Sequence, residues 1–226
     1  MSRIEQLNRN PFLSLHDLSI FYDFKFDPIK EYISYSNNHI LKVEEKVRRK
    51  IIKWDHENSS DPEIPDGYDV YQNEINTIRE FRPILYNSMF LTIYSLFENE
   101  FIALCEYAAK IQDSSLHPKD LSGKNYIDQC RRYIVKVLEV NLDKLNTEWE
   151  DITKFQTLRN SFAHKNGILK DKSAKYVAFI NRTKGLSLDE KTFKIKIKNY
   201  EFLISVINKL VRFLNSAIDK IVEQKG

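Results

Sequence analysis

The chain has 226 residues, of which 42% are hydrophobic and 30% are charged, and its formal net charge is +3. That length can bury a sizeable core, and the composition is that of an ordinary globular protein. The uncharged run over 83–97 is too short and too polar to cross a bilayer, and the first residues lack the apolar centre of a secretory signal. We therefore expect a cytoplasmic protein that does not enter a membrane.

Two long helices are predicted in the first half of the chain. Residues up to about Asp27 are rich in aromatic side chains and predict a short helix or turn packed on the body. Pro28 favours a helix start because proline is tolerated in the first turn, and apolar residues spaced by three or four extend this helix to about Glu57. A second helical pattern covers 69–112, and we expect it to be kinked or broken near Pro83.

The second half of the chain predicts two shorter helices, two strands and a last helix. After Gly167 the pattern changes, because apolar residues then alternate with lysines as in a strand. In chain order these five elements are predicted at about residues 124–140, 147–164, 176–180, 192–198 and 200–222. The sequence therefore predicts an all-α fold: an antiparallel helical bundle of long helices with one small β-hairpin inserted near the C-terminus, at about 176–198.

The residues with the clearest chemistry are Arg159-Asn160-Ser161-Phe162-Ala163-His164, at the end of a predicted helix. Arginine holds negative charge on a phosphate, and histidine moves protons near neutral pH. Metal-free cleavage of a phosphodiester needs such a pair. The five glycines are scattered singly, and no His, Cys, Asp or Glu residues have metal-ligand spacing, so we expect neither a metal nor a cofactor.

Positive charge is concentrated directly after these residues. The segment 165–198 carries ten Lys or Arg against three acids, whereas 55–69 carries six acids and no Lys or Arg. A basic segment beside an Arg/His pair suits a polyanionic partner. The alternative is a solvated loop and hairpin in which alternating lysines protect the edge of a strand.

The six residues from Arg159 to His164 resemble the Arg-polar-x3-His signature of the HEPN superfamily. The order of elements is similar too: a central apolar helix carries Tyr94-Ser95-Leu96-Phe97-Glu98-Asn99-Glu100, the motif closes a later helix, and a hairpin and an amphipathic helix follow. The resemblance covers about 70–222. We therefore expect residues 1–226 to form one HEPN-like domain, in which 1–69 elaborate a core bundle over 70–226.

The resemblance implies an activity. HEPN proteins are helical bundles, commonly dimeric, and many are metal-independent endoribonucleases of prokaryotic defence, abortive-infection and toxin–antitoxin systems. By this resemblance His164 would act as general base or acid in attack of a 2′-hydroxyl on the adjacent phosphorus, Arg159 would stabilise charge on the phosphate, and Asn160 would orient His164 or the phosphate. The residues expected to bind the RNA backbone are Lys165, Asn166, Lys170 and Lys172.

Two further positions refine this expectation. Glu98 stands where some HEPN families have a functional acidic residue, which makes it a candidate supporting acid; the alternative is an exposed polar position on an amphipathic helix. Toxins of the antitoxin-paired branch often carry Tyr two residues after the His, where this chain has Asn166. The resemblance therefore does not extend to that branch.

We expect a homodimer in which Arg159 and His164 of each copy meet at a composite site on a two-fold axis, with RNA as substrate and a regulatory partner encoded in the same operon. Two alternatives stay open. One is a non-catalytic HEPN-like module that binds RNA, a nucleotide or a protein partner. The other is a purely structural helical protein, in which the arginine and the histidine lie apart or in separate salt bridges.

Overall fold

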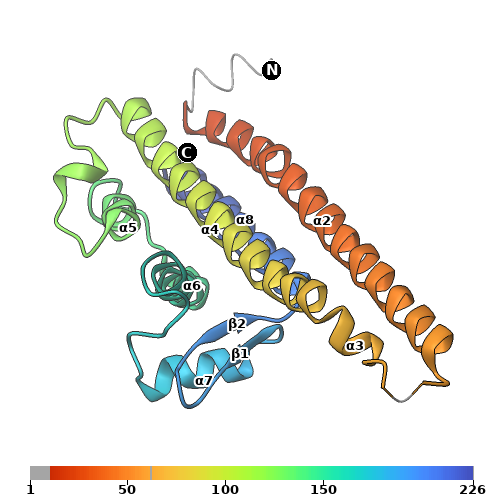
Figure 1. The fold of residues 1–226 in the computed structure, drawn as a ribbon. Coiled ribbons are helices and arrows are strands. Elements are labelled where there is room, and N and C mark those ends of the chain that lie inside the picture. The colour runs from red at the N-terminus through yellow and green to blue at the C-terminus, as the bar shows by residue number, and fades with distance from the viewer. Residues whose placement is uncertain (1–10, 62, 226) are drawn as a thin grey trace.

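The computed structural model describes residues 11–61 and 63–225. It confirms the predicted all-α bundle with one small hairpin near the C-terminus (Figure 1). The α-helices are α2 (Leu15–Asn58), α3 (Gly67–Val70), α4 (Gln72–Ile111), α5 (Tyr126–Lys136), α6 (Asn146–His164), α7 (Ala174–Arg182) and α8 (Tyr200–Lys225). The strands are β1 (Leu186–Leu188) and β2 (Ile195–Ile197), and short 3-10 helices cover Pro11–Ser14, Pro118–Asp120 and Asp143–Leu145.

Three long helices, α2, α4 and α8, run side by side and form the body of the molecule (Figure 1). On the other side of α4 from α2 lie α5 and α6, and α7 packs beside the hairpin. The central helix α4 contacts α2, α5, α6 and α8, which explains why its sequence is apolar on several sides. No helix within the described part of the chain has both the length and the hydrophobicity to span a membrane.

An aromatic cluster in the core fixes the end of α6 that carries the Arg/His residues. The ring of Phe90 on α4 lies 5.7 Å from that of Phe162 on α6 and 5.9 Å from that of Phe202 on α8. All three side chains are buried. Since aromatic pairs of this kind add to the stabilisation from burial, the last turn of α6 is held against both α4 and α8.

The start of α2 differs from the prediction. The helix begins at Leu15 and contains Pro28, so most of the aromatic N-terminal piece forms its first turns, and only the part with Phe12 is a separate short helix, Pro11–Ser14. Tyr22 and Phe26 are buried on the same face as Ile33, and this continuous apolar face outweighs the one backbone hydrogen bond that proline removes. Residues 1–10, at the start of the predicted N-terminal elaboration, lie outside the described residues.

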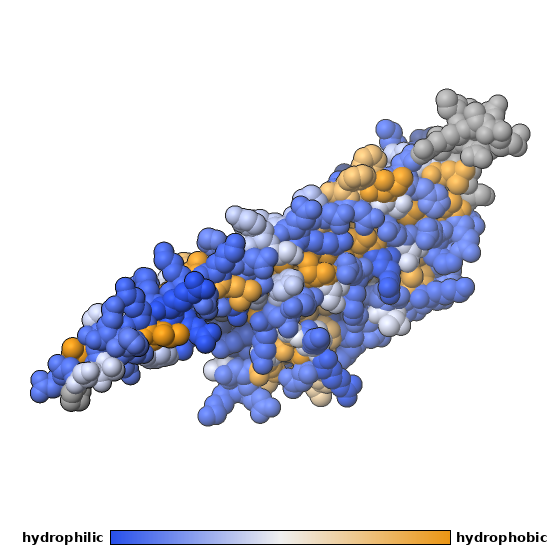
Figure 2. Space-filling model, turned by 90° about the vertical axis from the view of Figure 1, so that its right-hand side faces the viewer, coloured by the Kyte–Doolittle hydropathy of each residue, from blue (hydrophilic) through white to orange (hydrophobic). Residues whose placement is uncertain are grey.

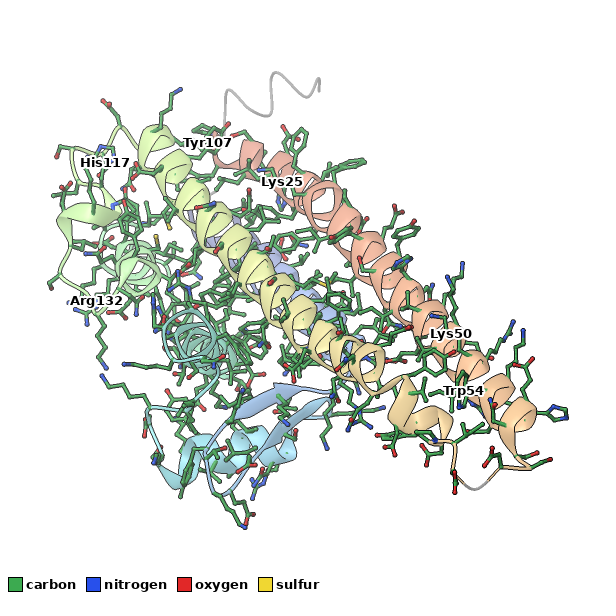
Figure 3. All side chains as sticks on the ribbon, in the orientation of Figure 1. Lys25, Lys50, Trp54, Tyr107, His117 and Arg132 are labelled. Carbon is green, nitrogen blue, oxygen red and sulfur yellow. The ribbon has the colours of Figure 1, made fainter. Side chains whose placement is uncertain are left out.

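The second long helix also passes through its proline without a break. Pro83 lies inside α4, and Arg82 beside it donates to both carboxylate oxygens of Glu44 on α2 at 2.8 Å. Figure 3 shows the side chains that link the two helices; among them Lys25 on α2 donates to both oxygens of the buried Glu100 on α4 at 2.7 Å. The two long helices are therefore held together by ion pairs as well as by their apolar faces.

The first predicted strand is wrong. Residues 176–180 belong to the helix α7, and the hairpin pairs β1 with β2 in antiparallel fashion, with Leu186 opposite Ile197. Residues 192–198 do contain the strand β2. Within α7, Ile180 is buried and the Phe179 ring lies 6.2 Å from that of Phe155 on α6, so these residues pack with helical spacing.

The two middle helices differ in their bounds from the prediction. The helix α5 ends at Lys136, before residue 140, and its first turn is capped by Asn125, whose side chain accepts from the backbone N–H of Asp128 at 3.0 Å. The helix α6 starts at Asn146, so Thr147 is its second residue. The predicted end of α6 at His164 is confirmed.

Candidate functional site

The chain leaves α6 through a tight turn that places the motif against the hairpin. The N–H groups of Lys165 and Gly167 both donate to the carbonyl of Ser161, at 3.0 and 2.9 Å, and close the last helical turn. Asn166 and Gly167 have φ angles of 50° and 80°, in the left-handed region. The carbonyl of Gly167 then accepts from Ile195 on β2 at 2.9 Å. The end of the motif is thereby fastened to the hairpin.

Arg159 and His164 lie in contact, although they are separated by about 140° around an ideal helix. The guanidinium reaches along the helix, and its Nη1 lies 3.5 Å from Nε2 of the imidazole. Arginine has no acceptor atom, so this contact is a hydrogen bond only when Nε2 carries no proton.

Asn160 and Glu98 complete the surroundings of the guanidinium. Nη1 of Arg159 donates to Oδ1 of Asn160 at 3.2 Å, and Nη2 lies 4.0 Å from Oε2 of Glu98 on α4. Asn160 thus contacts Arg159 directly, and its predicted role of orienting His164 or the phosphate stays a prediction. Glu98 is half-buried, and burial raises the pKa of its carboxyl while the charge of Arg159 opposes that rise. The two helices α4 and α6 meet at this pair.

Sequence analysis overlooked Tyr94, which lies one helical turn before Glu98. Its side chain is fully buried, and its hydroxyl has no hydrogen-bond partner among the described residues. Burial raises the pKa of this phenol further above its ordinary value; Glu98 adds to the rise and Arg159 opposes it. The spacing of four residues to Glu98 was the available signal, since it puts both side chains on one face of α4.

An open pocket of about 640 Å³ lies beside the imidazole. Thr157, Asn160, Ser161 and His164 line one wall, as their spacing along α6 predicts. Lys165, Lys170 and Asp171 complete the lining. Three of the lining residues were not among the predicted site residues: Thr157, Ser161 and Asp171. The pocket therefore combines an imidazole, hydroxyls and two ammonium groups.

The four residues predicted to bind RNA have different places. Lys165 and Lys170 line the pocket together with His164. Asn166 forms the left-handed turn after the helix and is exposed. The Lys172 ammonium lies over the ring of Phe193, 4.3 Å from its centre, and so is held at the hairpin. Two of the four side chains thus face the same space as the imidazole.

Arg159 lies beside His164, and His164 lines an open pocket, so the arrangement places a cation next to a proton acceptor that can act on a hydroxyl bound there. The purely structural alternative predicts Arg159 and His164 to lie apart or in separate salt bridges. The two are in contact, and Arg159 also forms an ion pair with Glu98. Within residues 11–61 and 63–225, no three His, Cys, Asp or Glu side chains gather closely enough to hold a metal ion. Comparisons of the chain with models of protein families, with curated proteins and with solved structures find no match.

Proposed function

We propose that this protein is a cytoplasmic, metal-independent endoribonuclease of the HEPN type, which acts in prokaryotic antiviral defence or stress response under the control of an operon-encoded partner. The observation that carries the proposal is the 3.5 Å contact between Arg159 Nη1 and His164 Nε2, because His164 lines the 640 Å³ pocket. A phosphodiester cleaved without a metal needs this combination of fixed positive charge and proton transfer in one place.

In the proposed reaction, the imidazole of His164 takes the proton of an RNA 2′-hydroxyl. The 2′ oxygen attacks the adjacent phosphorus, the bond from phosphorus to the 5′ oxygen breaks, and a 2′,3′-cyclic phosphate forms. The leaving 5′ oxygen receives a proton from the His164 of a second copy. General acid–base help of this kind contributes about 10²–10⁴-fold to a rate.

Arg159 has two successive partners in this scheme. Before reaction its guanidinium lies against the imidazole of His164. Once the imidazole is protonated the two cations repel each other, and the guanidinium turns to the phosphate, whose negative charge has increased. Asn160 and Glu98 limit how far the guanidinium moves, because both contact it.

The substrate class follows from the pocket lining. Lys165 and Lys170 offer ammonium groups to phosphates on either side of the cleaved bond, and such contacts do not depend on base sequence. The need for a 2′-hydroxyl restricts cleavage to RNA. The pocket of one chain is lined by one imidazole, that of His164, while the proposed reaction needs both a base and an acid. The second copy supplies the other imidazole.

The direct test is incubation of the purified protein with mixed RNA in EDTA, beside the variants His164→Ala and Arg159→Ala. We expect the wild type to leave 2′,3′-cyclic phosphate and 5′-hydroxyl ends, and each variant to lose about 100-fold or more of the rate. The matched controls are His56→Ala and Arg48→Ala, which remove the same two side-chain types from exposed positions on α2. These controls are expected to cleave like the wild type.

Two outcomes would overturn the proposal. One is RNA that stays intact with folded wild-type protein, even after addition of the proteins encoded beside it. The other is cleavage that persists in His164→Ala or leaves linear phosphate ends. If the RNA stays intact but binds with an affinity that depends on Arg159, the non-catalytic module is the better description.

A further inference from the structure

The outer side of α2 carries large apolar side chains that none of the residues 11–61 and 63–225 covers. Phe24 is 71% exposed and Tyr35 is 73% exposed, and four further apolar residues of α2 are more than half exposed, three of them in its N-terminal half. Across a shallow groove of about 530 Å³, α4 adds two more. We call this surface the α2 outer face: Ile20, Phe21, Phe24, Tyr32 and Tyr35 of α2 with Phe81 and Ile84 of α4. Figure 2 views this side of the molecule and shows hydrophobic residues along its length.

The exposed area is of the size that a stable dimer needs. Aromatic side chains bury about 150–250 Å² each when fully covered, so seven large side chains exposed by more than half offer on the order of 700–800 Å². A standard protein–protein interface buries about 800 Å² per partner, and monomers rarely leave contiguous apolar patches larger than a few hundred Å². This surface is therefore unusual for a protein that stays alone.

We propose that the α2 outer face binds the same face of a second copy, with the two α2 helices antiparallel about a two-fold axis. The axis passes near Ser36 and Asn37, which flank the midpoint of the 44-residue helix. The groove between α2 and α4, lined by Tyr32, Tyr35 and Phe81 among others, also lies at this midpoint. Antiparallel helices paired there overlap along their whole length of about 66 Å.

The side chains on this face are complementary to themselves in that arrangement. Phe24, Glu31, Tyr35, Asn38, Lys42 and Arg49 fall within a sector of about 60° around the helix, and all six are exposed. Residues equally far from the midpoint meet across the axis, so Glu31 of each copy faces Lys42 of the other. Phe24 similarly faces Arg49, which allows a cation–π contact.

Glu31 and Lys42 are available for such a pair. Neither forms an ion pair with another described residue of its own chain, and they are too far apart on α2 to reach each other. Across the two-fold axis the pair occurs twice, and its partial burial between two helices strengthens each contact relative to one on an open surface. Antiparallel pairing thus gives an ion-pair partner to Glu31 and to Lys42, which have none among the described residues of their own chain.

The charge around the N-terminal half of this face disfavours RNA and anionic lipid as occupants. The N-terminal half of the face is bordered by Asp23, Asp27 and Glu31, all exposed. The lysines of that half are engaged, since Lys25 contacts Glu100 and Lys30 contacts Asp27. A polyanion would therefore meet repulsion where the apolar side chains are densest.

This contact is separate from the candidate cleavage site. The helix α2 and the helix α6 lie on opposite sides of α4 (Figure 1). A second copy bound to α2 thus leaves the pocket beside His164 open to the copy that the proposed reaction needs there, so the two contacts are different interfaces and together link more than two chains. The proposal consequently stands or falls independently of the ribonuclease activity.

The test is the molar mass of the purified protein in solution, measured by sedimentation or light scattering over a range of concentrations, for wild type and for Tyr35→Glu. We expect the variant to have half the mass of the wild type, whose chain weighs 26.9 kDa. His164→Ala is expected to keep the wild-type mass. Tyr35→Glu is expected to keep the wild-type helical content, since the side chain is exposed.

Charge reversal identifies the orientation. Glu31→Lys and Lys42→Glu are each expected to weaken self-association at least tenfold, because each places like charges opposite one another twice. The double variant is expected to return to within about threefold of the wild type. Glu190→Lys, at an exposed position in the hairpin turn, is the control and is expected to change nothing.

Three results would overturn the proposal: a wild-type protein that is monomeric at 100 μM, a Tyr35→Glu variant with unchanged mass, or single charge reversals that the double variant does not repair. Loss of binding to anionic vesicles or to single-stranded RNA in Tyr35→Glu, with no change of mass, would assign the face to a membrane or to RNA.

Discussion

At Glu98, burial and a neighbouring charge act in opposite directions on one carboxyl group. The side chain is 25% exposed, burial raises its pKa, and Arg159 at 4.0 Å opposes the rise without cancelling it. The folded protein therefore binds this proton more tightly than the unfolded chain does. The corresponding stabilisation is present below the ordinary glutamate pKa and is lost as the pH rises through the folded-state value.

Glu98→Gln removes that titration while keeping the size of the side chain. We expect the free energy of unfolding of the wild type to fall relative to that of the variant as the pH rises from about 4 to 7. Urea unfolding at several pH values measures the difference. Glu190→Gln, in the exposed hairpin turn, is the matched control, and a difference for Glu98→Gln that stays constant with pH would contradict the expectation.

At the scale of single residues, the sequence predicts part of the candidate site. The four-residue spacing of Asn160 and His164 predicts a shared face, and both line the pocket. The length of the arginine side chain predicts that Arg159 can reach them. The meeting of Arg159 with Glu98 depends on how α4 packs against α6, and no local pattern contains that information.

At the scale of elements, the turn after α6 determines where the motif ends. Gly167 has a φ of 80°, and a Cβ atom added there would lie 3.2 Å from the carbonyl oxygen of Ile195. Any other residue would therefore meet both an unfavourable backbone conformation and the strand that the turn pairs with. Glycine at this position joins the motif helix to the hairpin.

Gly167→Ala is expected to cost about 1–3 kcal/mol of stability through backbone strain. For a chain of this size that corresponds to a fall of about 2–10 °C in Tm, measurable by circular dichroism or calorimetry. Asn166→Gly is the matched control, because glycine adopts the φ of 50° at that position without strain. A Gly167→Ala variant as stable as the wild type would show that the turn can rearrange.

The prediction of secondary structure was wrong where a short apolar run fits both the two-residue period of a strand and the 3.6-residue period of a helix. Residues 176–180 contain consecutive apolar side chains, which suit a buried strand as well as a helix of one or two turns. Their packing against Phe155 of α6 favours the helix, and this contact lies outside the local sequence. The longer patterns were predicted correctly in type because many turns repeat the same spacing.

At the scale of the whole molecule, the proposed composite site predicts that an inactive variant lowers the activity of the wild type. A mixed dimer of wild type and His164→Ala has one imidazole where the proposed reaction needs two. Random mixing of equal amounts leaves a quarter of the dimers with two wild-type chains, so we expect about a quarter of the rate of the same total amount of wild type. The measurement is cleavage after the two proteins are unfolded and refolded together.

Refolding the wild type together with His56→Ala is the control, and it is expected to keep the full rate. If the mixture with His164→Ala keeps half of the full rate, then each chain cleaves with its own histidine alone. The sequence predicts the class of the fold at this scale, since the long amphipathic patterns require a helical bundle. It does not predict which outer faces stay uncovered, because that depends on the angles at which the helices pack.

The packing of α8 against α2 and α4 joins the last helix of the chain to earlier ones. Four large apolar side chains of α8 are buried in the shared core: Phe202, Leu210, Phe213 and Ile218. Without them this core stays exposed to water. During synthesis α8 leaves the ribosome after α2 and α4, and until then the apolar faces of these two helices stay open to water and to chaperones. The bundle thus closes only once α8 is available, and a chain that stops before α8 lacks the support that holds the end of α6 in place.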